Sequence, residues 1–258
     1  MPATTEGLLL LRVIGATGAA ALGASIALPV KRTSHRLLCA MVSFAAGGLF
    51  GVTAQHIVPE TVHLAGPLQA GGALAAGLAL FWAVGRYLYF VCPACSASHL
   101  EGGYLKLGWL MIATMTLHSL TDGIAITAGH EAGLRSGTAL GALIFLAVSY
   151  HKVPEGLALM GVARMAGMSA LRAFSITLLV ELTTGLGALV GLLLSGMGET
   201  AMGVLLGLVG GSFLYVVLFA ILKEMWIHEK ASVLAFASLG ALSIVAAGFL
   251  IHPAASHG

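Results

Sequence analysis

Charged residues are scarce in this sequence of 258 residues. Lysine, arginine, aspartate and glutamate together make up 9% of the chain, whereas hydrophobic residues make up 59%. A soluble domain carries about 25% charged residues and needs polar groups over much of its exposed area. The low charge content therefore excludes a water-soluble globule and a disordered chain. It indicates a protein that crosses the lipid bilayer several times.

Two further absences narrow the class of protein. The formal net charge is +2 and no basic stripe is present, which excludes a nucleic-acid partner. The 3 cysteines cannot all pair with one another, so we do not expect a disulfide scaffold. The partners that remain are the bilayer itself and small ligands, and a homodimer is left open.

Long apolar segments fill most of the chain. A membrane-spanning helix needs about 20 mostly apolar residues, and eight segments meet this requirement, separated by short breaks such as Pro59-Glu60 and His130-Glu131. We therefore predict an all-α fold, a polytopic membrane protein with eight transmembrane helices in one domain, residues 1–258, with a cytoplasmic loop at 91–106. The predicted spans are residues 7–28, 37–58, 68–90, 107–129, 136–162, 170–194, 201–222 and 231–251.

Lysine and arginine are unevenly divided between the two ends of these spans. Nine of the 12 lie at one end and two at the other, while Lys152 belongs to neither group. Because short cytoplasmic loops are enriched in these residues, we expect both termini outside. The plasma membrane, in a bacterium the inner membrane, is the expected location.

Small residues recur every four positions in several spans, which predicts close approach of helix backbones. These residues are Gly15, Ala19, Gly23 and Ala27; Gly187 and Gly191; and Gly203, Gly207 and Gly211.

Two of the spans carry matched histidine and carboxylate residues near their middle. His118 precedes Asp122 by four residues, and His151 precedes Glu155 by four. This spacing places both side chains of a pair on one helical face. A buried charge in a membrane costs about 2.5 to 3.5 kcal/mol, which weighs against a merely structural role. The two pairs together predict a metal site suited to Zn²⁺, and also to Fe²⁺, Mn²⁺ or Cd²⁺.

Neighbouring residues modify this prediction. Pro154 lacks an N–H, so the carbonyl of Tyr150 loses its helical partner, which predicts a kink and a polar group free to face ions or water. Lys152 adds a positive charge beside the predicted ligands. We interpret its ammonium as standing in for a second cation, close to Glu181 or Glu155; snorkelling to an interface is the alternative.

The segments HSLTDG and HKVPEG, at residues 118–123 and 151–156, resemble the paired signatures of the ZIP (Zrt/Irt-like) metal transporter family. The resemblance extends to Gly47-Gly48 and to residues 55–60 in span two. It implies an eight-helix bundle with inverted repeats, outward termini, uptake of Zn²⁺ and related ions, and an elevator-like movement.

Carried over by position, the resemblance assigns the primary metal site to His118, Asp122, His151 and Glu155. Ser119 matches a position that is often asparagine, and Glu181 matches a carboxylate of a second site. Lys152 replaces a bridging carboxylate, so we expect one high-affinity metal.

Other metal-binding side chains lie nearer the ends of the spans. His56 is a candidate for guiding ions into the site, and His63 and His130 are candidates for capture ligands in outward loops. In the predicted cytoplasmic loop, Cys92, Cys95 and His99, with Cys39 and His35 nearby, suit a weak Zn²⁺ site; reduced thiols without a role are the alternative.

The predicted activity is uptake of a divalent metal ion, most of all Zn²⁺, into the cytoplasm by alternating access. The ion is cargo and no catalytic cofactor is expected. An intramembrane metalloenzyme is one alternative, although the predicted site has no His-Glu-x-x-His motif, and we expect no enzyme activity. A selective metal channel that uses the same site is the other alternative.

Overall fold

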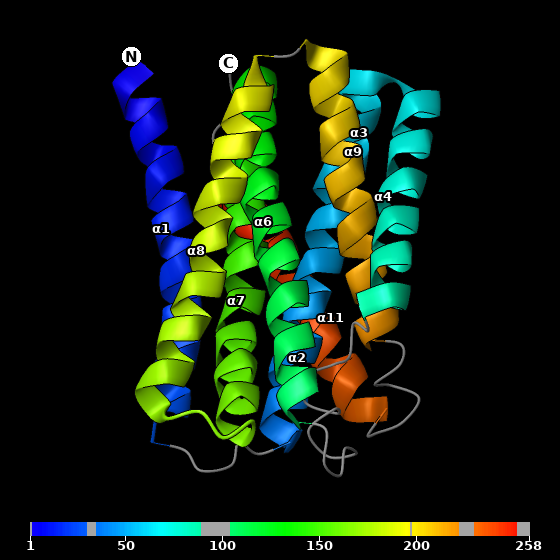
Figure 1. Ribbon diagram of the computed structural model, residues 1–258. Coiled ribbons are helices and arrows are strands. Elements are labelled where there is room, and N and C mark those ends of the chain that lie inside the picture. Colours follow the sequence, from blue (N-terminus) through cyan, green and yellow to red (C-terminus); the bar gives the residue numbers. More distant parts are fainter. Residues whose placement is uncertain (1, 30–34, 89–103, 197, 222–229, 252–258) are drawn as a thin grey trace.

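The computed structural model describes residues 2–29, 35–88, 104–196, 198–221 and 230–251. Within these ranges every regular element is helical, and the helices form eight rods packed side by side (Figure 1). Two rods are composite, because α2, η1 and α3 follow one another directly and α9 continues into η2. The elements are α1 Pro2–Ala27, α2 His35–Val52, η1 Thr53–Ile57, α3 Val58–Ala65, α4 Pro67–Leu88, α6 Tyr104–Ser136, α7 Leu140–Met165, α8 Ala170–Ser195, α9 Glu199–Val216, η2 Val217–Ile221 and α11 Lys230–Ile251.

The eight predicted spans correspond to the eight rods, which confirms the all-α class and the number of helices. By length and composition, seven rods of the described chain qualify as membrane spans. The eighth rod, α6, carries two of the predicted metal ligands, His118 and Asp122.

Two predicted breaks are wrong. Pro59-Glu60 lies inside a helical rod, because Pro59 falls in the first turn of α3, where a missing N–H is tolerated. The π-helical segment η1 precedes it, and the rod ends only at Gly66, whose φ is +77°. Likewise α6 continues through His130-Glu131 to Ser136 and ends before Gly137, whose φ is +66°. Glycine in a left-handed conformation, rather than proline or charge, ends both rods.

Reciprocal glycine contacts join the rods into four pairs among the described residues. In each pair, one glycine of each helix lies against a backbone carbonyl of the other helix, three residues before the partner glycine. No side chain fits at these points. The contacts are Gly23 with Val153 and Gly156 with Ala20; Gly47 with Ala237 and Gly240 with Phe44; Gly77 with Leu208 and Gly211 with Leu74; and Gly123 with Thr184 and Gly187 with Leu120.

These four pairs, α1–α7, α2–α11, α4–α9 and α6–α8, are also the four most extensive contacts between helices. Successive rods alternate in direction (Figure 1), so the two members of each pair run parallel. Close parallel packing over glycine allows van der Waals and Cα–H···O contacts. Three of the glycines, Gly23, Gly187 and Gly211, lie in the small-residue stripes, so the predicted close approach is confirmed there.

The pairs combine into two groups of helices. We call α1, α6, α7 and α8 the ligand half, because the four residues of the predicted primary metal site lie on it, and α2, η1, α3, α4, α9 and α11 the second half. The halves meet mainly where α7 packs on α2 and α6 packs on α9. At this seam the rings of Phe44 and Tyr150 are in contact, with centroids 5.1 Å apart and planes tilted by 53°.

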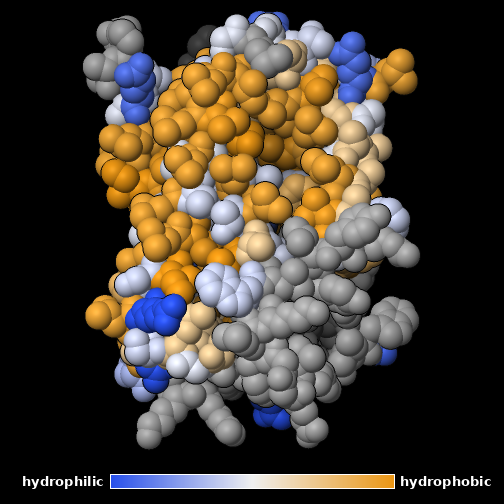
Figure 2. All heavy atoms as spheres, viewed as in Figure 1, coloured by the Kyte–Doolittle hydropathy of each residue, from blue (hydrophilic) through white to orange (hydrophobic). Residues whose placement is uncertain are grey.

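The outer surface is apolar around its middle. Figure 2 shows hydrophobic residues across the central band of one face and the most hydrophilic residues toward its two ends. Exposed leucines such as Leu193, with 84% of its surface exposed, point outward from the bundle, as expected for a lipid-facing surface. Because the eight rods alternate in direction, α1 begins and α11 ends at the same end of the bundle (Figure 1).

Candidate metal site

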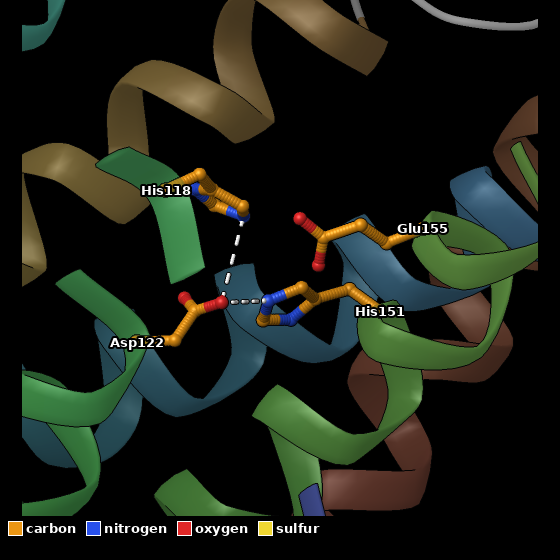
Figure 3. Close-up of side chains that lie close together, drawn as sticks. All are labelled: His118, Asp122, His151 and Glu155. Atoms are coloured by element: carbon orange, nitrogen blue, oxygen red, sulfur yellow. Dashed lines mark hydrogen bonds and ion pairs between the residues drawn. The ribbon is translucent and has the colours of Figure 1, made fainter. Parts of the chain in front are cut away.

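The two histidine–carboxylate pairs converge between α6 and α7. Figure 3 shows His118 and Asp122 from α6 facing His151 and Glu155 from α7. One ligand atom of each residue can be chosen so that all four lie within 4.8 Å of one another. All four side chains are buried, and Asp122 is completely enclosed. Their i, i+4 spacing on two neighbouring helices produces this convergence, and the donor set of two imidazoles and two carboxylates fits a divalent metal ion.

His151 is oriented by its own helix. Its Nδ1 lies 3.1 Å from the carbonyl oxygen of Ala147, and because a carbonyl only accepts, Nδ1 carries the proton. In the neutral imidazole, Nε2 then has a lone pair, which points at Asp122 Oδ2 at 3.1 Å. Two acceptors at this distance repel unless a cation lies beside them, and Lys152 Nζ lies 2.9 Å from the same oxygen. The arrangement is the one expected of a metal-binding histidine held by a backbone carbonyl.

Lys152 connects α6, α7 and α8 beside these ligands. Its Nζ lies 2.9 Å from Asp122 Oδ2, 3.0 Å from Glu155 Oε2 and 2.9 Å from Glu181 Oε2. It also donates a hydrogen bond of 2.7 Å to Ser119 Oγ, which in turn donates to Glu181 Oε2 at 3.3 Å. Lys152 is fully buried, so the alternative that it snorkels to an interface is wrong.

The ligand residues retain unused binding capacity. An ammonium group has three N–H donors but four oxygen neighbours here, and neither carboxylate oxygen of Glu155 receives a hydrogen bond. His118 Nδ1, Asp122 Oδ1 and Glu181 Oε1 are also buried without a hydrogen-bond partner. Buried polar atoms without partners are rare and costly. Their concentration around one point is what a site for a cation requires.

The second half closes the site on one side. The ring of Phe213, from α9, lies edge-on to His151 with centroids 6.5 Å apart, and only 1% of Phe213 is exposed. The imidazoles of His118 and His151 are themselves 5.3 Å apart. The candidate site therefore lies at the seam between the halves.

The remaining predicted residues lie elsewhere. Cys92, Cys95 and His99 fall outside the described residues. His56 lies in η1 and is partly buried, and His63 is exposed on α3. His130 does not lie in a loop, because it is buried within α6 and its Nδ1 accepts a hydrogen bond of 2.7 Å from Arg12 Nη1.

The pairing of Arg12 with His130 was not anticipated from the sequence. The two residues are 118 positions apart, so no local pattern joins them. The one available signal was an arginine within an apolar span, which requires a partner.

The chain is similar in sequence to known proteins. The profile of the family described as ZIP Zinc transporter matches residues 93–252. The chain is 32% identical to Zinc transporter ZIP10 of Mus musculus over 137 residues, 52% of this chain and 16% of that protein. It is 27% identical to Zinc transporter ZIP13 of Pongo abelii over 224 residues, 82% of this chain and 64% of that protein. For Zinc transporter YKE4 of Saccharomyces cerevisiae the identity is 24% over 171 residues, 60% and 47% of the two chains.

A helical bundle with apolar spans and a buried cluster of histidine and carboxylate residues defines a membrane protein with a candidate metal site. The chain belongs to the ZIP zinc transporter family. This confirms the resemblance noted in the sequence. It also disfavours the metalloenzyme alternative, because the family comprises transporters and not enzymes. The match to ZIP10 covers only 16% of that relative's length.

Proposed function

We propose that this chain carries Zn²⁺ across the membrane by alternating access, through one metal site formed by His118, Asp122, His151 and Glu155. The observation that supports this most strongly is the convergence of four buried ligand atoms within 4.8 Å, at the seam between the two halves. Fe²⁺, Mn²⁺ and Cd²⁺ are the competing ions that this donor set would also accept.

Charge balance favours a single ion. With Asp122, Glu155 and Glu181 ionised, the cluster carries three negative charges and Lys152 adds one positive charge. One divalent ion then makes the cluster neutral, whereas a second would leave it at +2. A neutral cluster crosses an apolar interior at far lower cost than a charged one. The Lys152 ammonium, 3.0 Å or less from all three carboxylates, occupies the place of a second cation.

Movement of the ligand half against the second half would expose the site to each side in turn. The α1–α7 and α6–α8 contacts hold the ligand half together, and the reciprocal glycine contacts join helices within a half and never across the seam. The uneven division of lysine and arginine supports an orientation with both termini outside a plasma or bacterial inner membrane. The proposed direction of transport, into the cytoplasm, rests on the resemblance to the family. Assembly as a homodimer is compatible with this scheme.

The test is uptake of radioactive Zn²⁺ into liposomes containing the purified chain. His118→Ala and Glu155→Ala should abolish uptake, while Glu199→Gln, an exposed residue in the first turn of α9, serves as the control and should transport normally. Equal uptake by all three variants and the wild type would overturn the proposal. Saturation at a slow turnover is expected for a carrier, and flux that does not saturate would indicate a channel instead.

A further inference from the structure

Lys152 lies among the candidate metal ligands without being one of them. It follows His151 and precedes Glu155 on α7, and its side chain is fully buried. An ammonium group has only N–H donors, so it cannot bind a metal ion. A charge buried in a membrane span is costly and is kept where it has a function. The proposed transport cycle contains a step that needs such a charge.

This step is the return of the carrier after the ion has left. Without a divalent ion, the carboxylates of Asp122, Glu155 and Glu181 would take three negative charges through an apolar interior, at a cost that rises with each uncompensated charge. A carrier that exchanges one ion for another avoids this step, because it crosses loaded in both directions. The positive charge of Lys152 therefore matters most when the carrier crosses without an ion.

The contacts of Lys152 Nζ fall into two groups. Asp122 Oδ2 at 2.9 Å and Glu155 Oε2 at 3.0 Å belong to the proposed metal ligands. Glu181 Oε2 at 2.9 Å and Ser119 Oγ at 2.7 Å lie outside that ligand set. Glu181 and Ser119 are fully buried, and Ser119 Oγ donates a hydrogen bond to Glu181 Oε2. These two residues thus form a joined pair of acceptors for the ammonium.

The two groups of contacts suit the two ways in which the carrier crosses. When a divalent ion takes the oxygens of Asp122 and Glu155, the ammonium keeps Glu181 and Ser119 as partners. After the ion has left, the ammonium compensates Asp122 and Glu155 across 2.9 Å and 3.0 Å. Because its side chain already reaches both groups of oxygens, the exchange requires no movement of a helix.

We propose that Lys152 is a tethered cation that compensates the carboxylates while the carrier returns without an ion. Glu181 and Ser119 are positioning residues, which hold the ammonium when the ion is bound. This inference rests on the proposed transport function and assigns its return step to one residue. It concerns the rate of a step, whereas the charge balance described above concerns the number of bound ions.

Net uptake and exchange of Zn²⁺ separate the return step from the rest of the cycle. Liposomes that contain the full chain receive radioactive Zn²⁺ outside, and those for exchange are preloaded with non-radioactive Zn²⁺. Lys152→Met, which keeps the length of the side chain and removes its charge, should slow net uptake by at least about tenfold. Exchange at saturating Zn²⁺ should continue near the wild-type rate, because the loaded carrier does not need the ammonium.

Glu181→Gln tests the positioning role. It removes the charge that retains the ammonium, so Lys152 then competes with the ion for Asp122 and Glu155. The KM for Zn²⁺ should rise about tenfold in both assays. Thr177→Val is the matched control, because Thr177 is fully buried on the same helix and its hydroxyl donates to the Ala173 carbonyl of that helix. It should keep the wild-type KM and both rates.

Each result bears on one part of the proposal. Net uptake and exchange that fall together in Lys152→Met, or that both keep the wild-type rates, overturn the tethered cation. Loss of Co²⁺ absorption by purified Lys152→Met would also contradict it, since the four ligands are unchanged. An unchanged KM in Glu181→Gln overturns the positioning role. His118→Ala should lose both net uptake and exchange, and normal exchange by that variant would overturn the proposed function instead.

Discussion

Replacing Gly187 by alanine should separate α8 from α6. A Cβ at Gly187 would meet the Leu120 carbonyl, with the carbonyl carbon at 2.8 Å and the oxygen nearer still. Restoring ordinary contact, which begins at 3.4 Å, requires the backbones to move apart by at least about 0.6 Å. Neither partner atom can rotate away, because both belong to backbone inside a helix.

This displacement has a magnitude that can be measured. Overpacking of this kind costs about 1 to 3 kcal/mol, which corresponds to a melting temperature lower by roughly 3 to 10 °C for a chain of this length. It also lengthens the 2.9 Å contact between Lys152 and Glu181, since these residues lie on α7 and α8. We therefore expect Gly187→Ala to reduce Zn²⁺ uptake without removing any metal ligand.

Gly185→Ala is the matched control for this experiment. Gly185 lies two residues earlier on the same helix, and a Cβ there would have nothing within 4 Å. Because alanine favours the helix by up to about 1 kcal/mol over glycine, this variant should melt at the wild-type temperature or above it. The measurement is the melting temperature of both variants and the wild type in the same detergent. Equal melting temperatures would refute the reasoning about reciprocal glycine contacts.

Three further predictions concern the charged residues. Lys152→Asp should raise the Zn²⁺ content of the purified chain from one ion to two, because a carboxylate replaces the ammonium; metal analysis that finds one ion would contradict our interpretation of Lys152. Zn²⁺ affinity should fall steadily as the pH is lowered, since the histidines must be neutral and the carboxylates ionised to bind; calorimetric titration that finds tighter binding in acid would contradict the ligand set. Arg12→Ala should lower the free energy of unfolding by about 1 to 3 kcal/mol, because it leaves buried His130 Nδ1 without its donor. Arg135→Ala is the control and should have a smaller effect, since the hydrogen bond from Arg135 to Ser195 is exposed. Equal losses of unfolding free energy would show that the Arg12 contact adds little.

The sequence predicted the spans well and the ends of two rods poorly. The length of each apolar run was enough to identify the helices, because a membrane-spanning helix needs apolar side chains along its whole length. Pro59 and Glu131 were misread as breaks, because proline is tolerated in the first turn after η1 and charge does not stop a helix. The glycines that end these rods, Gly66 and Gly137, were visible in the sequence, but their positive φ values were not.

The candidate site could be predicted because its ligands come in pairs that are close in sequence. His118 with Asp122, and His151 with Glu155, each share a helical face through spacing alone. Contacts that depend on how the helices pack were harder to predict from the sequence. The sequence suggested that Lys152 lies near Glu181, but the hydrogen bond through Ser119 and the cover provided by Phe213 required the three-dimensional arrangement.

The four parallel pairs also constrain how the chain assembles during synthesis. In the described part of the chain, no rod shares reciprocal glycine contacts with the rod next to it in sequence. The pairs are α1 with α7, α6 with α8, α4 with α9 and α2 with α11. The ligand half is therefore complete once α8 has been inserted, while α2 and α4 still lack their partners. A ribosome that releases helices in order would deliver the ion-binding part first. Insertion of α11 would then provide the missing partner of α2.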